Sequence, residues 1–370
     1  MILELIVFIL ILSFLIFIHE FFHFLAAKRA NVKVEEFGFG LPPRIFGKKI
    51  GETIYSINLL PFGGFVRLYG EDRYQEVEKE RSFISQKPLV KAKILLAGVT
   101  ANFLLAILFF YIVLGLENFS VFLPSLFGQK FLFGEESQYI VVGNVAENSP
   151  AQRDGIKPYD LIISANGKKI NNPQDFVEFV HQQKGKEIVL EVKNLKEGEK
   201  RQIKTTPREH PPKGQGPLGV AISTIVHLEY KSLSQKIFSG FLHSLNILDY
   251  SFKLFGRLIK VSFEKKTIQP IAESVSGPVG IFFLVKITLK EGVGALLNLI
   301  ALLSLSLGLI NILPIPATDG GRLIFVLYEA LFKKPIPEKI ERNFNLAGYI
   351  VLILLLFLIT FKDIRQFLIP

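Results

Sequence analysis

The chain has 370 residues, of which 49% are hydrophobic and 21% are charged. A mean hydropathy of +0.38 is too apolar for an ordinary soluble protein and predicts several membrane spans beside a sizeable water-exposed part. The net charge of +10 indicates, in a membrane protein, Lys and Arg at the cytoplasmic face rather than a nucleic-acid partner. Cysteine is absent, which excludes disulfides, thiol catalysis and Cys-ligated zinc and leaves His and carboxylate side chains as metal ligands.

The first apolar segment, residues 1–27, contains the sequence His19-Glu20-Phe21-Phe22-His23. On a helix this spacing places the two imidazoles on one face, where both can bind a single zinc ion. Glu20 is then placed to act as a base toward water held at the metal. Three ionisable groups inside a bilayer cost roughly a few kcal/mol each when they are unpaired. Although the motif also occurs by chance, its location favours a metal site over a merely structural cluster of His and Glu.

Three further segments approach the ~20 apolar residues that a membrane-spanning helix needs, namely residues 94–116, 293–316 and 343–361. The connecting segments 28–93 and 317–342 hold thirteen and five Lys and Arg residues, whereas none precedes the first span. Since basic loops stay in the cytoplasm, we expect these two loops inside and both termini outside. The long region 117–292 is then extracytoplasmic.

A third ligand is needed, because catalytic zinc usually takes three protein ligands and a water. The strongest candidate is Asp319, which follows Pro314 and Pro316 at the end of the third apolar segment. The two prolines end the helix and leave irregular backbone at the inner membrane boundary. His19 lies about 26 Å along the first helix, and therefore at a matching depth. The alternative is a solvated carboxylate in an ordinary Asp-Gly turn.

These motifs resemble the site-2 proteases, a family of zinc intramembrane proteases, and their order is closest to the bacterial sigma-E-regulator type. The other matching pieces are Gly38-Phe39-Gly40, residues 60–65, Ala97-Gly98 with Ala101-Asn102-Phe103, residues 276–281 and Asn311-x-x-Pro-x-Pro-x-x-Asp319-Gly. Two positions depart from the family pattern, because Thr318 stands where Leu is usual and Val99 stands where Pro is usual. Neither position ligates metal or carries protons.

The resemblance implies a zinc-dependent endopeptidase of the bacterial inner membrane that performs regulated intramembrane proteolysis. One Zn2+ ion would be bound by His19, His23 and Asp319, and Glu20 would be the catalytic residue. The substrates would be the transmembrane segments of single-span membrane proteins, such as a membrane-bound anti-sigma factor or signal-peptide remnants.

Residues 50–70 alternate aromatic and β-branched residues with Gly and Pro, which predicts a strand, a turn and a second strand. The resemblance implies a β-structure that folds back into the membrane near the zinc. A helical substrate must be unwound before attack, and a strand edge can hold the unwound segment by β-augmentation. The alternative is a hairpin that only packs against the helices. The candidate substrate-binding residues are Gly38, Gly40, Gly63, Gly64, Asn102 and Asn311, although the two Asn side chains could instead bond helix to helix.

Residues 139–207 combine strand patterns, Asn-Gly turns and a short helical pattern, and they resemble a protease-associated PDZ domain. Such a domain binds an extended peptide end in a groove, and a purely structural cap is the alternative. Residues 233–263 carry apolar residues at helical spacing, which predicts an amphipathic helix in contact with lipid at the outer interface. The expected fold class is a polytopic α-helical membrane protein with about four transmembrane helices, a membrane-associated β-loop and an inserted α+β PDZ domain.

Two competing functions use the same features. A membrane-anchored protease of soluble peptides would need the His-Glu motif in a water-facing segment, and here the motif is embedded. A non-enzymatic membrane scaffold could display the PDZ domain, with zinc structural or absent. We favour the intramembrane protease, whose expected partners are transmembrane substrates, a peptide or protein segment at the PDZ groove and membrane lipid, with no nucleic acid.

Overall fold

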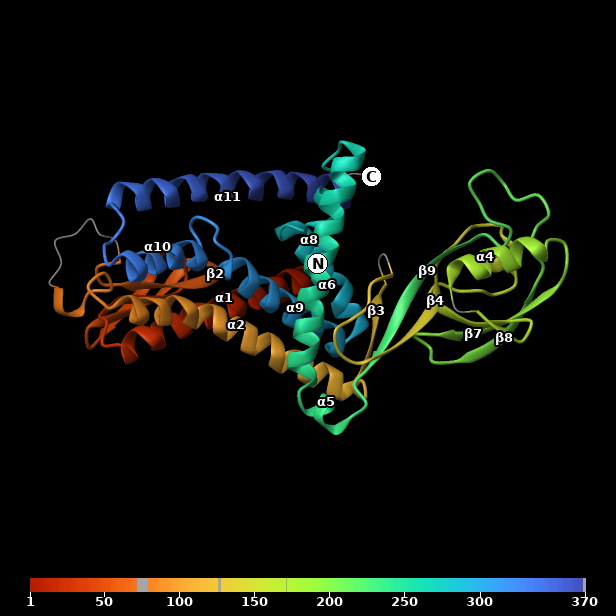
Figure 1. Ribbon diagram of the computed structural model, residues 1–370, viewed down its shortest axis with the longest axis horizontal. Coiled ribbons are helices and arrows are strands. Elements are labelled where there is room, and N and C mark those ends of the chain that lie inside the picture. The colour runs from red at the N-terminus through yellow and green to blue at the C-terminus, as the bar shows by residue number, and fades with distance from the viewer. Residues whose placement is uncertain (72–78, 126–127, 171, 369–370) are drawn as a thin grey trace. The chain divides into compact units, whose positions relative to one another are not determined.

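The computed structural model describes residues 1–71, 79–125, 128–170 and 172–368. Residues 72–78 of the expected basic loop therefore lie outside the described part. The chain forms two compact units: a helical unit, Met1–Val113 with Phe255–Pro370, and an inserted unit, Leu114–Leu254. The helical unit combines long apolar helices with a small antiparallel sheet, and the inserted unit holds a larger sheet (Figure 1). The expected class, a polytopic helical membrane protein with an inserted α+β unit, is confirmed.

Four helices in the described residues are long and apolar enough to cross a membrane: α1 (Ile2–Arg29), α2 (Pro88–Leu116), α9 (Val293–Ile312) and α11 (Glu338–Phe367). A helix suits this environment because it satisfies its own backbone polar groups, for which lipid offers no partner. α9 is shorter than the apolar segment 293–316, because Pro314 and Pro316 lack the N–H groups that would continue it. α2 and α11 extend beyond the expected spans through polar turns at their ends.

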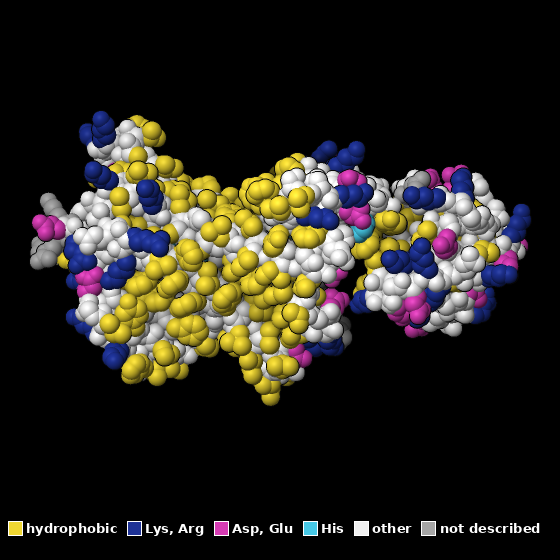
Figure 2. Space-filling view, turned by 90° about the horizontal axis from the view of Figure 1, so that it is seen from below, with side chains coloured by type: hydrophobic (Ala, Val, Ile, Leu, Met, Phe, Trp, Pro, Cys, Tyr) yellow, Lys and Arg dark blue, Asp and Glu magenta, His cyan; other side chains and the backbone are white. Residues whose placement is uncertain are grey.

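Hydrophobic side chains cover much of the helical unit's surface in the face that Figure 2 shows. α11 is the most exposed span, since only 6% of its apolar window is buried, against 28–39% for the other three. Leu354, Phe357 and Leu358 on α11 are each more than half exposed. An apolar surface of this extent requires lipid as its surroundings, so the chain is an integral membrane protein.

α1 is the helix on which the helical unit is assembled. Its first half packs through Leu15 and neighbouring residues against Val285 of α8 (Pro278–Glu291) and Leu299 of α9. Its second half packs through Phe24 against the small sheet, α2 and α10 (Asp319–Phe332). Because lipid is as apolar as these side chains, close packing rather than escape from water stabilises such contacts.

The small sheet consists of β1 (Val34–Ile50) and β2 (Thr53–Leu68), which are antiparallel. Phe37 of β1 pairs with both Tyr55 and Val66, so the first half of β1 lies between two segments of β2. The strand–turn–strand expected within residues 50–70 is thus only part of a longer sheet that begins at Val34. The sequence pattern hid β1, because Gly and Pro residues interrupt its alternation.

A charged cluster ties the turn of this sheet to the end of α1. Glu52 accepts hydrogen bonds from Lys28 at 2.8 Å and from Arg81 at 2.6 and 2.9 Å. The Arg81 guanidinium, and then the Lys28 ammonium, lower the pKa of Glu52 to about 2. The carboxylate therefore stays charged, and the sheet stays fastened to α1, throughout the physiological pH range.

The inserted unit is built on a sheet in the order β3-β9-β4-β5-β7-β8, with β6 paired to β5. Its elements are β3 (Ser120–Pro124), β4 (Glu135–Val145), α3 (Pro150–Arg153), β5 (Asp160–Ala165), β6 (Lys168–Lys169), α4 (Pro173–Gln182), β7 (Ile188–Asn194), β8 (Lys200–Thr205) and β9 (Val220–Glu229). β9 pairs with β4 along its whole length. The unit therefore extends beyond residue 207, where the sequence pattern ended, because β9 closes the sheet from a distance that local patterns do not reveal.

The expected amphipathic helix 233–263 is divided into α5 (Leu233–Ile237) and α6 (Ser239–Lys265). Asn246 of α6 is fully buried and fastens this helix to the segment before β4. Its Oδ1 accepts from the backbone N–H groups of Leu132 and Phe133 at 2.9 and 3.0 Å. Its Nδ2 donates to the Phe133 carbonyl at 2.9 Å and to the Tyr230 hydroxyl at 3.0 Å.

We expect Asn246→Ala to destabilise the inserted unit by about 2–4 kcal/mol, because it leaves several buried polar groups without partners. Hydrogen exchange of the Leu132 and Phe133 amides should accelerate accordingly. Asn144→Ala is the matched control, because Asn144 makes an exposed bond to its own neighbour, and it should change stability by less than about 0.5 kcal/mol. Unchanged exchange in Asn246→Ala would show that this network does not hold the segment.

Candidate metal centre

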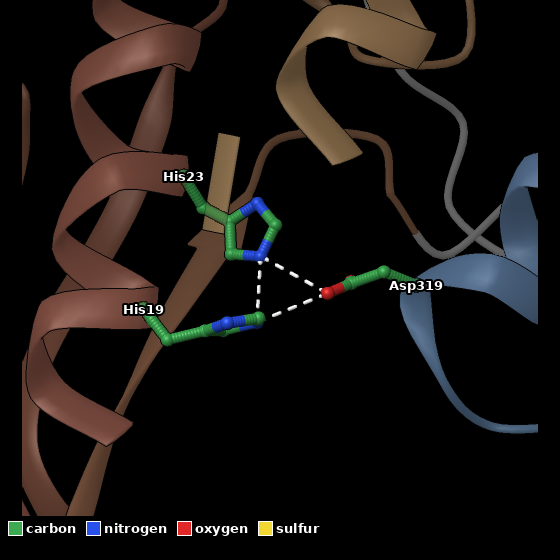
Figure 3. Close-up of side chains that lie close together, drawn as sticks. All are labelled: His19, His23 and Asp319. Carbon is green, nitrogen blue, oxygen red and sulfur yellow. Dashed lines mark hydrogen bonds and ion pairs between the residues drawn. The ribbon is translucent and has the colours of Figure 1, made fainter. Parts of the chain in front are cut away.

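Three side chains from two distant parts of the chain converge inside the helical unit. His19 and His23 lie one turn apart on α1 and are 5% and 6% exposed. Asp319 is the first residue of α10. Its Oδ2 lies 3.0 Å from Nε2 of His19 and 3.3 Å from Nε2 of His23, and the two Nε2 atoms are 3.0 Å apart. All three side chains point to one common point (Figure 3).

The local sequence explains why Asp319 reaches this point. Past α9 the chain turns through Pro314 and Pro316, which cannot continue the helix, and α10 begins three residues after the second proline. Thr318 caps α10, since its Oγ1 accepts from Gly321 N at 3.3 Å and donates to the Ile315 carbonyl at 2.8 Å. A Leu at this position could not make either bond. The departure at Thr318 therefore strengthens the turn that presents the carboxylate.

The donor set fits zinc. Two imidazole nitrogens and one carboxylate oxygen are the ligands of known catalytic zinc sites, which leave a fourth position for water or substrate. Ligand atoms about 2.0–2.2 Å from zinc in a tetrahedron lie about 3.3–3.5 Å apart. The observed separations of 3.0–3.3 Å differ from these values by a few tenths of an ångström. The cluster also explains how three ionisable groups are accommodated among apolar helices, because a cation satisfies all of them.

α2 forms one wall of this cluster. Nδ1 of His23 lies 2.7 Å from the carbonyl oxygen of Ile94, and Nδ1 of His19 lies 3.0 Å from the side-chain amide of Asn102. Between them, Gly98 approaches both imidazoles so closely that a Cβ there would lie 2.4 Å from Nε2 of His23. Hence only glycine leaves room for the two rings and an ion.

A buried ion pair holds α10 to the same helix. Lys91 of α2 is 2% exposed, and its Nζ donates to both carboxylate oxygens of Glu329 at 3.0 and 2.8 Å. Glu329 lies on α10, the helix that Asp319 begins. The pair therefore fixes the far end of α10 while the metal cluster fixes its start.

Glu20 is half-buried next to His19 and is held by the small sheet. Its Oε2 accepts a hydrogen bond from the backbone N–H of Val66 at 3.2 Å. Gly63 of the same strand has a positive φ of 77° and lies against Ile16 of α1, where a Cβ would be 2.6 Å from the Ile16 side chain. The glycine lets β2 approach α1 just before the His-Glu motif, which brings a strand edge beside the carboxylate.

The remaining candidate residues lie in different places. A Cβ at Gly64 would lie 2.8 Å from the Gly38 carbonyl oxygen and 3.8 Å from Phe17 of α1, and Cβ atoms at Gly38 and Gly40 would also meet other parts of the small sheet. Asn311 lies in the last turn of α9, and no hydrogen bond in the described residues joins it to the three ligands. Asn102, expected at the substrate or between helices, contacts His19. The sequence did not reveal the roles of Ile94 and Val66, because both act through backbone atoms that every residue possesses.

We expect Gly98→Ala to lose most of its bound zinc, because the added methyl group occupies the space between the two imidazoles. The measurement is zinc per chain by metal analysis after purification. Gly115→Ala on the same helix is the control, since a Cβ there meets nothing within 4 Å. Full zinc content in Gly98→Ala would contradict this geometry.

Comparison with known proteins gives a consistent result. The model of "Peptidase family M50" matches residues 7–355. A Clostridium perfringens protein named as a zinc metalloprotease is 33% identical over 352 residues, which cover 95% of this chain and 96% of the relative. A Campylobacter jejuni protein named in the same way is 31% identical, and the match covers 97% of this chain and 92% of the relative. Zinc metalloprotease RasP of Geobacillus kaustophilus is 26% identical and covers 97% of each chain.

Among solved structures, the PDZ domain of the SdrC-like protein from Listeria monocytogenes aligns with 25% of this chain and 93% of its own. The sequence identity is 21% and the TM-score is 0.20.

Proposed function

The chain belongs to peptidase family M50 and is a zinc metalloprotease, and on this premise we propose that it cleaves peptide bonds within membrane-spanning segments of other proteins. The observation that carries this proposal is the location of the metal cluster. His19 and His23 lie on a helix that is long and apolar enough to cross a membrane, and Asp319 follows a second such helix. A substrate must therefore reach the site at membrane depth.

We assign one role to each residue of the cluster. His19, His23 and Asp319 hold one zinc ion, and Glu20 accepts a proton from the attacking water and returns it to the leaving nitrogen. Zinc, when bound, lowers the pKa of water in its open position and polarises the substrate carbonyl. The Val66 N–H, 3.2 Å from Glu20, orients the carboxylate toward the cluster. The carboxylate cannot rotate freely between proton transfers while this bond persists.

The small sheet is the proposed substrate clamp. Unwinding one turn of a substrate helix in lipid exposes several backbone groups, each costing roughly several kcal/mol without a partner. β2 approaches α1 closely at Gly63, just before the His-Glu motif, and an edge strand can pair with such freed groups. The same strand holds Glu20 through Val66, so a paired substrate would lie next to the base.

The proposed orientation places the metal cluster toward the cytoplasm and the inserted unit outside. Lys28 and Arg29 occupy the last turn of α1, and Lys and Arg side chains are densest at one end of the helical unit (Figure 2). Basic residues of this kind stay on the cytoplasmic side. The resemblance to the sigma-E-regulator type favours single-span substrates, such as a membrane-bound anti-sigma factor or signal-peptide remnants.

We further propose that the inserted unit binds the free C-terminus of a peptide. β9 is paired with β4 on one edge, and among the described residues β3 and Ser125 bond to its other edge from Thr224 onward. The remaining part, residues 220–223, lines an apolar groove through Val220 and Ile222 together with α4 and the loop Gly216–Gly219. Arg208 lies beside this loop and donates to the Gly216 carbonyl at 3.3 Å, which supplies positive charge for a terminal carboxylate. β3 limits the ligand to about four extended residues at about 3.3 Å each.

Two alternatives are less well supported. A protease of soluble peptides would need its metal ligands in a water-facing segment, whereas His19 and His23 are buried on an apolar helix. A non-enzymatic scaffold would not need a carboxylate beside two zinc ligands. Mutation of that carboxylate separates the scaffold from the enzyme.

We expect Glu20→Gln to lower the rate of cleavage of single-span membrane proteins by at least about 10²-fold while bound zinc stays near one per chain. Asp319→Asn should lower zinc content and activity together, because it weakens a ligand. Cleavage in detergent or liposomes and metal analysis are the two measurements. Wild-type activity in zinc-loaded Glu20→Gln would overturn the assignment of Glu20 as the base. Full zinc retention in Asp319→Asn would overturn the assignment of Asp319 as a ligand.

For the groove, we expect a tetrapeptide ending in a free Val carboxylate to bind and its amidated form to bind much more weakly. Extending the peptide to ten residues should leave Kd unchanged within about threefold, because β3 occupies the next part of the edge. Val177→Glu on α4 should weaken binding, and Gln174→Glu, which makes the same charge change outside the groove lining, should not. Tighter binding of the longer peptide would contradict the proposed limit.

A further inference from the structure

The two histidines of the candidate metal centre are supported differently by α2. His23 Nδ1 meets a backbone carbonyl, that of Ile94, which can only accept a hydrogen bond. His19 Nδ1 meets a side chain, that of Asn102, whose amide can either donate or accept. The support of His19 therefore depends on the residue type at position 102, whereas any residue at position 94 offers the same carbonyl.

Ligand chemistry decides which amide atom faces His19. Nε2 of His19 points to His23 and Asp319, so this nitrogen is the one that binds the metal. A neutral imidazole that binds through Nε2 carries its proton on Nδ1 and must donate it. Only Oδ1 of Asn102 can accept that proton, so the amide must be turned with its oxygen toward the ring.

Burial alone does not select this orientation. With Nδ2 facing His19, Oδ1 is buried and has no hydrogen-bond partner among the described residues. Turning the amide exchanges the two atoms, which are not distinguished by shape, and leaves the nitrogen in the unpartnered place. Since one amide atom lacks a partner in either case, the proton on His19 is the deciding interaction.

The position of Asn102 is fixed independently of its amide. The residue is fully buried, and its backbone carbonyl accepts a hydrogen bond from Ser304 Oγ of α9 at 2.8 Å. A Cβ on Gly308 of α9 would lie 3.4 Å from the Asn102 Cβ, so α9 packs closely against it. The side chain is thus held in place before any metal binds.

We infer that Asn102 is a positioning residue for the proposed metal ligand His19. Its Oδ1 accepts a hydrogen bond from the Nδ1–H group of His19 and fixes the ring with Nε2 toward the zinc. This role rests on the proposed zinc site and replaces substrate contact as the function of Asn102. Loss of such a partner typically lowers metal affinity about 10–100-fold. The effect acts on the metal, and substrate need not be present to observe it.

The test compares zinc dissociation constants, measured by chelator competition, in variants of the full-length protein in detergent. In Asn102→Leu the side chain has a similar shape but cannot accept a hydrogen bond, and this variant should bind zinc about 10–100-fold more weakly. Asn102→Asp retains an acceptor and strengthens it, so its affinity should equal or exceed that of the wild type. Thr100→Val is the control, because it removes an exposed hydroxyl of α2 that bonds to the Leu96 carbonyl of its own helix, and it should stay within about threefold of the wild type.

The visible spectrum of the cobalt-substituted protein supplies a second readout. Asn102→Leu should alter the ligand-field bands of the wild type, and Asn102→Asp should retain an intense tetrahedral spectrum. If Asn102→Leu does not fold, Asn102→Asp alone decides the question. Weaker zinc binding in Asn102→Asp would then contradict the inference, because a buried carboxylate weakens binding when no N–H of His19 donates to it. Wild-type affinity in Asn102→Leu, or equal losses in Asn102→Leu, Asn102→Asp and Thr100→Val, would overturn the inference. The proposed zinc site fails separately, if His19→Ala and His23→Ala retain zinc.

Discussion

The helical unit depends on bringing three ionisable side chains to one point among apolar helices. His19, His23 and Asp319 would each destabilise a membrane-embedded structure if they were left unpaired. Together they form a set that one cation could satisfy, and a cation held there would join α1 to the start of α10. The break after α9, the close approach of Gly98 and the cap at Thr318 all serve this convergence. Metal binding and folding of the membrane part are therefore linked processes.

The small sheet adds a second constraint to the same place. Val66 gives its N–H to Glu20 rather than to a neighbouring strand, so β2 and the proposed base form one assembly. A substrate strand that pairs beside β2 would be aligned with the carboxylate by the sheet itself. Positioning of substrate and proton transfer would then share one structural element, and a shift of β2 would disturb both.

Much of this site could be predicted from the sequence because its chemistry lies in side chains at fixed spacing. Two His residues one turn apart, a Glu between them and an Asp after a pair of prolines are distinctive in apolar segments. The Ile94 carbonyl and the Val66 N–H could not be predicted, because backbone groups leave no mark in the sequence. β1 and β9 were missed for another reason. Glycines and prolines interrupt the pattern of β1. β9 joins its sheet by pairing with β4, and the paired residues Val145 and Val220 are seventy-five positions apart in the sequence.

The contacts of α2 have a consequence for changes of chain length. Lys91, Ile94, Gly98 and Asn102 follow intervals of three, four and four residues, which place them on one stripe of the helix. In this order they meet Glu329, His23, both imidazoles of the cluster, and His19. One residue inserted within this stretch would rotate everything beyond it by about 100° and shift it by about 1.5 Å. Part of the stripe would then face lipid, so the site constrains the number of residues in this stretch of α2 as well as their identity.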